Sequence, residues 1–220
     1  MKYNSVSDII GPVMIGPSSS HTAGAVRIGQ IARSIYGGQA ESAEIIFYGS
    51  FAHTFKGHGT DVAIVGGLLG LSTFDERIPK AIELAKEEGM KVIISVSDDP
   101  VRHPNTARIK LSGSKGDLEV VGESVGGGSV CMIEMNGFRM QVYGDVPTLI
   151  VMHRDKAGVI ATITDVFARH KVNISHMEVS RLNKGDIALM SLETDEPISE
   201  DILLDLRKLE NTERVVNVKL

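Results

Sequence analysis

Apolar residues recur at helical spacing in one part of the chain and run consecutively in others. Apolar positions three or four residues apart, from Ala25 to Ile35, predict a helix that ends at Gly37. Consecutive apolar residues predict a largely buried strand at 43–48 and a strand with a continuous apolar centre at 91–97. Further helices are expected to begin at residues 60 or 61 and at 81, and further strands to cover 107–111, 118–122, 130–135 and 138–142. The first part of the chain is therefore predicted to be a mixed α/β domain.

The pattern changes after Pro147. Strands are predicted at 148–153, 173–181, 186–193 and 214–218, and two helices with one apolar face are predicted around Ile163 and Leu206. The order β-α-β-β-α-β is that of a ferredoxin-like unit. The chain is therefore predicted to be an α+β protein with two domains, residues 1–146 and 147–220.

Composition excludes several classes of function. The formal net charge is −5 and no basic run occurs, which argues against nucleic acid as a partner. No apolar run approaches the roughly 18–20 residues that cross a bilayer, and no signal peptide pattern is present, so no membrane partner is expected. The single cysteine, Cys131, fits a reducing cytoplasm and cannot by itself hold an iron–sulfur cluster.

The first polar segment follows Gly16-Pro17 and precedes the first predicted helix. It places four hydroxyls and one imidazole in consecutive positions: Ser18, Ser19, Ser20, His21 and Thr22. The N–H groups in the first turn of a helix lack intrahelical partners, so such side chains beside them can hold a carboxylate or phosphate. The simpler interpretation is a serine-rich helix cap without a ligand.

A second polar loop is predicted at residues 53–61, where His58 stands between two glycines. Glycine permits open backbone conformations and close approach by a ligand. Either Thr60 or Asp61 is expected to cap the helix that follows. Histidine titrates near neutral pH, which suits His58 to proton abstraction.

Two more loops complete the polar set. Residues 98–106 contain two prolines, which keep the segment out of a helix, and the hydrogen-bond donors Arg102, His103 and Asn105. Residues 124–129 form a glycine-rich loop whose exposed amides could wrap an anion or accept close approach by a partner chain. A flexible turn without function is the alternative for this last loop.

Several known kinds of site are not present in the sequence. No histidine or cysteine spacing typical of a zinc site occurs, and no serine lies in a Gly-x-Ser-x-Gly nucleophile elbow. Gly66, Gly67 and Gly70 fall within a helical pattern rather than before it, which does not fit a dinucleotide-binding fingerprint.

Taken together, the four loops resemble a known family. Gly-Pro-Ser-Ser-Ser-His-Thr (16–22), Lys-Gly-His-Gly-Thr-Asp (56–61), His-Pro-Asn-Thr (103–106) and Ser-Val-Gly-Gly-Gly (124–128) occur in the order seen in iron–sulfur L-serine dehydratase. Over its full length the chain resembles the separate beta chain of the two-chain form. The part after residue 146 resembles an ACT domain, and the first domain resembles the allosteric substrate-binding domain of some phosphoglycerate dehydrogenases.

The resemblance implies a β-elimination in which L-serine loses water and the resulting enamine hydrolyses to pyruvate and ammonia. It also implies a [4Fe–4S] cluster, held by a separate alpha chain, that acts as a Lewis acid on the leaving hydroxyl. This chain alone is then expected to be inactive. The competing hypothesis is a non-catalytic, serine-sensing regulatory subunit.

Roles for individual residues follow from the same resemblance. His58 is the expected general base, and homo-dimerisation through the ACT domain is expected. The expected substrate-binding residues are Ser18, Ser19, Ser20, His21, Thr22, Gly57, Thr60, Asp61, His103, Asn105, Thr106, Gly127 and Gly128. The expected effector-binding residues are Asp155, Ala157, Gly158 and Asn173.

Overall fold

The computed structural model describes residues 14–218. It divides the chain into two compact units, Met1–Met132 and Ile133–Leu220. Within the described residues, no helix is both long and apolar enough to cross a bilayer.

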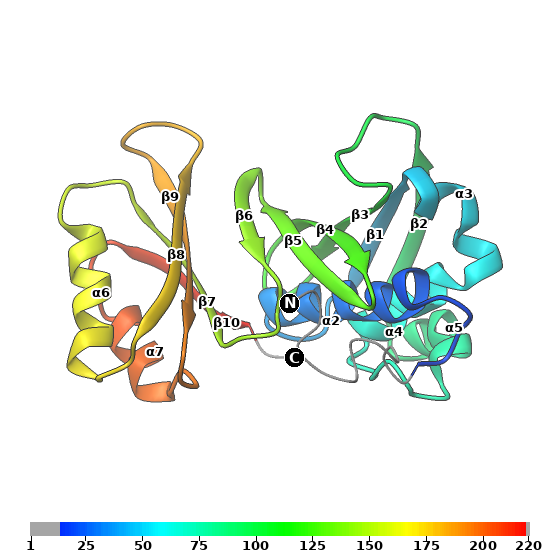
Figure 1. Ribbon diagram of the computed structural model, residues 1–220, viewed down its shortest axis with the longest axis horizontal. Helices are drawn as coiled ribbons and strands as arrows, with labels where there is room; N and C mark the ends of the chain where they lie inside the picture. Colours follow the sequence, from blue (N-terminus) through cyan, green and yellow to red (C-terminus); the bar gives the residue numbers. More distant parts are fainter. Residues whose placement is uncertain (1–13, 219–220) are drawn as a thin grey trace. The chain divides into compact units, whose positions relative to one another are not determined.

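The first unit combines helices with a mixed sheet (Figure 1). Its helical segments are η1 (Ser19–Ala23, a π-helical turn), α2 (Gly24–Tyr36), α3 (Gly49–His58), α4 (Thr60–Leu68), η2 (Ile78–Lys80) and α5 (Ala81–Glu87). Its strands are β1 (Ser42–Tyr48), β2 (Lys91–Ser97), β3 (Asn105–Ser112), β4 (Leu118–Gly126) and the first part of β5 (Ser129–Met135). The sheet order is β2-β1-β3-β4-β5-β6, and β6 (Phe138–Val142) falls within the second unit. Strand β1 pairs parallel with β2 and antiparallel with β3, which confirms the mixed α/β prediction.

Helices α2 and α4 lie side by side and pack closely because glycines occupy their contact (Figure 1). A Cβ on Gly29 would lie 2.3 Å from the carbonyl oxygen of Ile64, and one on Gly67 would lie 2.0 Å from a carbonyl oxygen of α2. Gly122 of β4 similarly leaves room for Ile28 of α2, which a Cβ would approach to 2.9 Å. These glycines set the position of α2 on the sheet and therefore the position of η1 at its N-terminal end.

Helix α3 corrects the prediction of a loop at residues 53–61. Its sequence contains glycine and histidine, which are weak helix formers, but tertiary contacts hold the helix. Phe51 is fully buried, and its ring centroid lies 5.9 Å from that of Phe47 on β1. The ring centroid of Phe55 lies 5.4 Å from that of Phe47. Burial of this aromatic face therefore outweighs the local preference.

The glycine-rich loop predicted at 124–129 is also shorter than expected. Strand β4 continues to Gly126 and β5 begins at Ser129, so only Gly127 and Gly128 form the turn. Both have positive φ, 62° and 85°. A two-residue type I′ hairpin requires this backbone, which glycine adopts without strain.

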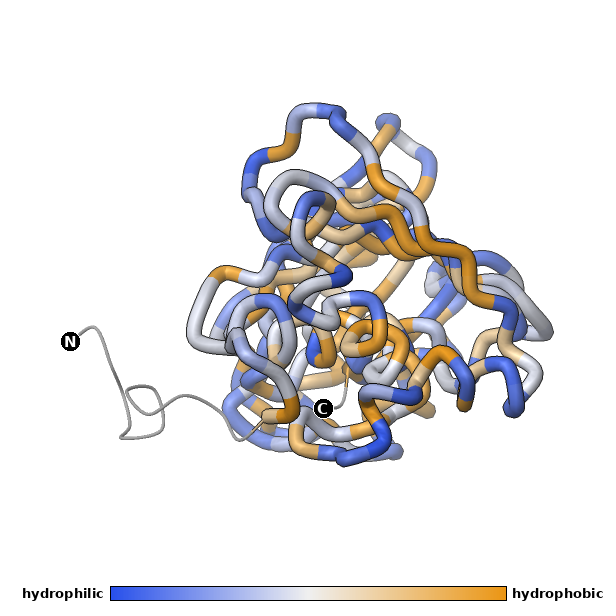
Figure 2. Tube along the Cα trace, turned by 90° about the vertical axis from the view of Figure 1, so that its right-hand side faces the viewer, coloured by the Kyte–Doolittle hydropathy of each residue, from blue (hydrophilic) through white to orange (hydrophobic). Residues whose placement is uncertain are grey.

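Strand β2 is less buried than its apolar sequence predicts. It lies at the edge of the sheet, and Ile93 and Val96 are 45% and 53% exposed. In Figure 2 hydrophobic residues form long stretches through the trace, whereas most outer turns are hydrophilic. An apolar run therefore predicted the strand correctly but not its place in the sheet.

The second unit contains the predicted β-α-β-β-α-β order, which is thereby confirmed. Its elements are β7 (Thr148–Arg154), α6 (Val159–Arg169), β8 (Ile174–Arg181), β9 (Ile187–Thr194), α7 (Glu200–Arg207) and β10 (Thr212–Val218). The sheet order is β10-β7-β9-β8 with antiparallel pairs, and its core includes Val151, Phe167 and Leu206. Strand β6 belongs to this unit and packs on β8 and β9, and the Ser180 hydroxyl donates to the Arg139 carbonyl at 2.6 Å.

Candidate active site

The serine-rich segment forms a π-helical turn that leads directly into α2. Ser18 precedes the turn in extended conformation, and its Oγ accepts a hydrogen bond from the His21 N–H at 3.3 Å. Gly16 has φ of +136°, and a Cβ there would lie 2.4 Å from the Thr22 hydroxyl oxygen. Glycine is therefore required where the chain turns over Thr22, and the predicted helix start is confirmed.

His21 is held on three sides. Its Nδ1 lies 3.3 Å from Ser18 Oγ, and its Nε2 lies 3.1 Å from Ser50 Oγ at the start of α3. Its ring centroid is 5.2 Å from that of Phe51, in an edge-on arrangement. Burial lowers the pKa of His21 below its ordinary value, and the neighbouring His58 lowers it further. His21 is therefore a fixed imidazole whose neutral form is favoured.

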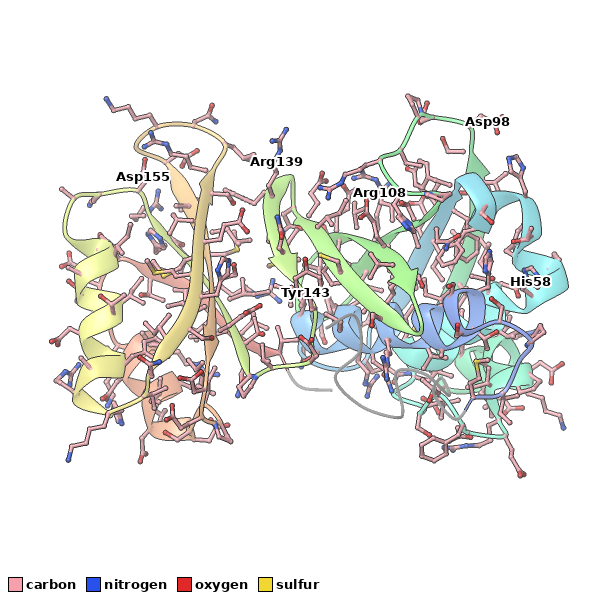
Figure 3. All side chains as sticks on the ribbon, in the orientation of Figure 1. His58, Asp98, Arg108, Arg139, Tyr143 and Asp155 are labelled. Atoms are coloured by element: carbon pink, nitrogen blue, oxygen red, sulfur yellow. The ribbon has the colours of Figure 1, made fainter. Side chains whose placement is uncertain are left out.

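His58, the last residue of α3, lies beside His21 but is bound differently. The two ring centroids are 4.7 Å apart, and the His58 carbonyl accepts a hydrogen bond from the Thr22 hydroxyl at 3.4 Å. Its Nδ1 is buried and has no hydrogen-bond partner among residues 14–218. Figure 3 shows His58 at the outer end of α3. One nitrogen of this ring is therefore left without a hydrogen bond inside the described part of the chain.

Only one of the two glycines beside His58 adopts the open backbone conformation that the sequence predicts. Gly59 adopts φ of +66° and ends α3, whereas Gly57 is an ordinary helical residue. Gly59 is also the N-cap of α4, so the prediction that Thr60 or Asp61 caps that helix is wrong. The Thr60 hydroxyl is fully buried and has no partner in the described part of the chain.

Asp61 is engaged within the chain. Its Oδ2 lies 2.7 Å from Lys56 Nζ, and its Oδ1 accepts a hydrogen bond from the Val62 N–H at 2.9 Å. Asp61 as a whole residue is 4% exposed, whereas the Lys56 side chain is 73% exposed. The pair closes the turn that carries His58, so the structure gives Asp61 a local contact in place of a free carboxylate.

The third and fourth motifs join the first through hydrogen bonds. Asn105 donates from its amide side chain to the Ser124 carbonyl at 3.4 Å, and the Ser124 hydroxyl donates to the Ser20 carbonyl at 2.8 Å. His103 Nδ1 accepts from the Asn105 N–H at 3.1 Å, and its carbonyl accepts from Thr106 Oγ1 at 2.6 Å. The structure thus links the motifs at residues 16–22, 103–106 and 124–128, and His58 adjoins them through Thr22 and His21.

Two residues of this cluster have no signal in the sequence motifs. Ser50, the partner of His21 Nε2, is marked only by its place directly after a predicted strand. Arg27 lies on α2 and donates from Nη1 to the Gly128 carbonyl at 2.8 Å, which holds the glycine turn beside the helix. Both contacts join positions far apart in the sequence, so only the fold identifies them.

The residues of this chain do not fit an iron–sulfur cluster. Cys131 is the single cysteine, and its side chain is buried in β5. Within residues 14–218, no group of three or more histidine, cysteine, aspartate or glutamate side chains could hold a metal ion. Cluster ligation by this chain is therefore not supported by its own side chains.

The expected effector residues are not brought together within one chain. Asp155 lies on the turn between β7 and α6 (Figure 3), where its Oδ2 accepts from the Gly185 N–H at 2.9 Å and from Arg181 Nη1 at 2.8 Å. These two contacts, the Gly185 N–H first, hold the pKa of Asp155 below its ordinary value. Asn173 precedes β8 at the other end of the sheet and donates to Asp195 Oδ2 at 2.6 Å.

Ala157 and Gly158 stand beside Asp155 at the N-terminal end of α6. Gly158 is the N-cap of the helix with φ of +89°, and no atom lies within 4 Å of the place a Cβ would take. Three of the four expected effector residues therefore lie at one turn, and Asn173 does not.

Comparison with known proteins places this fold and site in a family. The family model of the serine dehydratase beta chain matches residues 5–135, and that of the ACT domain matches residues 148–211. The chain belongs to the serine dehydratase beta chain family and carries an ACT domain. The family resemblance and the fold class predicted from the sequence are confirmed.

Individual relatives agree with this assignment. The chain is 52% identical over 218 residues, 99% of each chain, to a probable L-serine dehydratase beta chain of Bacillus subtilis. It is 37% identical over 200 residues, 90% of each chain, to the L-serine dehydratase beta chain of Peptoniphilus asaccharolyticus. A match of 37% identity over 159 residues covers 60% of this chain and 35% of L-serine dehydratase TdcG of Escherichia coli. The predicted enzyme class, L-serine dehydratase, is therefore confirmed.

Proposed function

We propose that this chain is the beta subunit of an L-serine dehydratase and supplies the general base of the reaction. The observation that carries the proposal is the pair of imidazoles formed by His21 of η1 and His58 at the end of α3. His21 has hydroxyl oxygens near both ring nitrogens, whereas His58 Nδ1 is buried without a partner among the described residues. A base needs a lone pair that no hydrogen bond occupies, and His58 Nδ1 has no partner among residues 14–218.

In the proposed reaction His58 Nδ1 takes the α-proton of L-serine. The electrons of that C–H bond form the C=C bond while the β-hydroxyl departs and, with a proton, becomes water. The enamine product then tautomerises and hydrolyses to pyruvate and ammonia. Burial and, after it, the neighbouring His58 lower the pKa of His21, so the ring beside the proposed base favours its neutral form.

The hydroxyls and amides of the linked motifs form the proposed substrate-binding wall. Ser18, Ser19, Ser20 and Thr22 lie in the turn before α2, where helix N–H groups favour a carboxylate. His103, Asn105, Thr106, Gly127 and Gly128 support this wall through the contacts that tie their loops to η1 and α2. Asp61 is assigned to positioning the His58 turn because Lys56 and the Val62 N–H already engage its carboxylate.

The cluster implied by the family is assigned to a separate alpha chain. That assignment rests on the lack of suitable ligands in this chain and on its kinship with proteins called beta chains. The work of this chain is then confined to binding serine, orienting it and moving the α-proton. Alone it is expected to form no pyruvate.

Reconstitution tests the proposed function. The purified chain and its alpha chain are combined without oxygen, and pyruvate is measured after addition of L-serine. Pyruvate formation by the pair, and none by this chain alone, is the expected result. A pair that associates but forms no pyruvate would overturn the proposal and favour the serine-sensing regulatory subunit, to which the ACT domain also lends itself.

We also propose that the turn at Asp155, Ala157 and Gly158 binds an amino-acid effector. Support comes from the open position beside Gly158 at the N-terminal end of α6. Titration calorimetry of the full chain with L-serine tests this, because a Gly158→Val variant should lose the heat that the wild type shows. Equal heats from both would contradict it.

A further inference from the structure

Strand β2 is an edge strand without the features that usually protect an edge. Each of its residues pairs with β1 on one side, and no strand of residues 14–218 lies on its other side. An unpaired edge offers N–H and C=O groups to another strand, and proteins commonly block such edges with charges, prolines or bulges. Residues 92–97 contain no charged residue and no proline, and their register with β1 has no bulge. This edge is therefore free to pair.

The same strand leaves apolar side chains uncovered in the described part of the chain. Ile94 pairs with the fully buried Ile45, so residues 92, 94 and 96 face the core side of the sheet. Val96 is nevertheless 53% exposed at one end of this row. At the other end lies a groove of about 440 Å³, lined by Ile82, Lys86, Gly89, Met90, Lys91 and Val92. One end of β2 thus presents an apolar side chain, and the other end has a partly apolar groove beside it.

Charge is distributed unevenly along β2. Lys91 is its first residue, and Asp98 and Asp99 directly follow its last. Lys91 and Asp98 are exposed and have no ion pair within residues 14–218. A parallel neighbour of the same sequence would place like charges side by side, whereas an antiparallel neighbour brings each lysine to an aspartate. The strand is therefore complementary to a second copy of itself in the antiparallel direction.

We propose that two copies of this chain join their β2 strands in an antiparallel pair about a two-fold axis at Ile94. Ile94 is the middle residue of β2, so this register pairs the strand over its whole length. Val96 then lies opposite Val92 of the second copy, beside the groove that Val92 lines. The contact occurs twice because the axis relates the two copies. Each exposed valine is thereby covered by apolar residues of the other copy.

The same register brings the unpaired charges together. Lys91 lies opposite Ser97 of the second copy, directly beside Asp98. No like charges face each other along the paired strands. The contact involves the first unit and is therefore separate from the dimerisation expected through the ACT domain, and it does not depend on the proposed function.

A single cysteine tests the proposed register. Ile94→Cys is made in a Cys131→Ser background, so that each chain carries one thiol, and the full chain is oxidised and run on a non-reducing gel. A covalent dimer is expected because the two thiols meet at the axis. Ser97→Cys in the same background is the matched control, since the two residues 97 would lie about 20 Å apart, well beyond the reach of a disulfide. Circular dichroism and Tm show whether each variant is folded.

Charge reversal tests the same contact without altering the apolar residues of the strand. Lys91→Asp and Asp98→Lys should each weaken self-association of the full chain at least about tenfold in analytical ultracentrifugation, because two attractive pairs become repulsive. The double variant restores opposite charges and should return to within about threefold of the wild type. Asp117→Lys, at an exposed aspartate of the turn between β3 and β4, is the control and should leave self-association unchanged.

Three results would overturn the inference. One is a folded Ile94→Cys variant that forms no covalent dimer, or no more than Ser97→Cys does. Another is self-association that neither single charge reversal changes, which decides the question if Ile94→Cys does not fold. The third is wild-type self-association of Lys91→Asp together with weakened binding to the alpha chain, because the alpha chain would then occupy the edge. None of these results bears on pyruvate formation by the pair, so the proposed function is tested separately.

Discussion

Two helix ends in this chain carry polar groups, and they differ in what those groups contact. At the end of α3, His58 Nδ1 and Thr60 Oγ1 are buried without partners in the described part of the chain. At the start of α6, Asp155 is bound by a backbone N–H and an arginine of the same unit. A buried polar atom left unpaired costs about 1–3 kcal/mol. Such a cost is retained where the atom has a use outside the chain, so the α3 end is the better candidate for chemistry.

The largest effect is expected from His58→Ala. General-base catalysis contributes roughly 10²- to 10⁴-fold to a rate, so kcat of the reconstituted enzyme should fall by about that factor. Serine-to-pyruvate assays under anaerobic conditions measure it, with complex formation checked by size-exclusion chromatography. Alpha-chain content and cluster content should not change.

His53→Ala is the matched control, because His53 is an exposed histidine on the same helix. Its turnover should match the wild type. Near-normal turnover in His58→Ala would remove His58 as the base and with it the contrast between the two helix ends.

Asp61→Ala should act mainly on stability. It removes the acceptor for the Val62 N–H and the partner of Lys56, so the free energy of unfolding should fall by about 1–2 kcal/mol and Tm by roughly 2–8 °C. Lys56→Met should cost less than about 1 kcal/mol because that side chain is 73% exposed. An Asp61→Ala variant with unchanged Tm and a strongly raised KM would instead support the substrate contact expected from the sequence.

Ser50→Ala should have a smaller effect, and it acts on His21, the neighbour of His58. It removes the hydroxyl 3.1 Å from His21 Nε2, and a neutral hydrogen bond contributes about 0.5–1.5 kcal/mol, so kcat/KM should fall about 2- to 10-fold. The Tm should fall by about 1–6 °C. Ser114→Ala, at an exposed serine of the same unit, serves as the control and should leave kcat/KM unchanged. A full-activity Ser50→Ala variant would show that His21 does not need this contact.

Local signals were enough to predict much of the fold. The apolar spacing before Gly37 identified α2, and the order of elements after Pro147 identified the ferredoxin-like unit, because each is decided by neighbouring residues. Helix α3 was missed because Phe51 and Phe55 stabilise it through Phe47, a contact that no local window contains. The edge position of β2 was missed for the same reason, since strand order is a property of the whole sheet.

The candidate site was predictable in its residue types but not in its pairing. The motifs at 16–22 and 56–61 both contributed residues to the expected site, and in the structure the ring centroids of His21 and His58 lie 4.7 Å apart. Which ring is held and which is open depends on Ser50, a residue outside both motifs. Asp61 was expected to bind substrate, and in the structure its carboxylate contacts Lys56 five residues earlier. Hydrogen-bond partners therefore decide roles that residue types leave open.

The smallest effect is expected at the other helix end, from Asp155→Asn. The Gly185 N–H and Arg181 stabilise the ionised carboxylate and lower its pKa in the folded chain. The stabilisation is therefore complete above the ordinary aspartate pKa of about 3.9 and is lost as the pH falls through the lower folded-state value. The Tm of the wild type should exceed that of Asp155→Asn at pH 7, and the difference should shrink below about pH 3.9. Thermal unfolding from pH 3 to 7 measures it.

Asp186→Asn is the control for this comparison. Asp186 is exposed, follows Gly185 in the turn between β8 and β9, and has no ion pair on its carboxylate within residues 14–218. Its Tm difference from the wild type should stay constant with pH. A constant difference for Asp155→Asn as well would mean that the Asp155 contacts do not depend on its charge. The turn before α6 would then resemble the end of α3 in having a polar group whose role lies outside the chain, and the contrast between the two helix ends would fail.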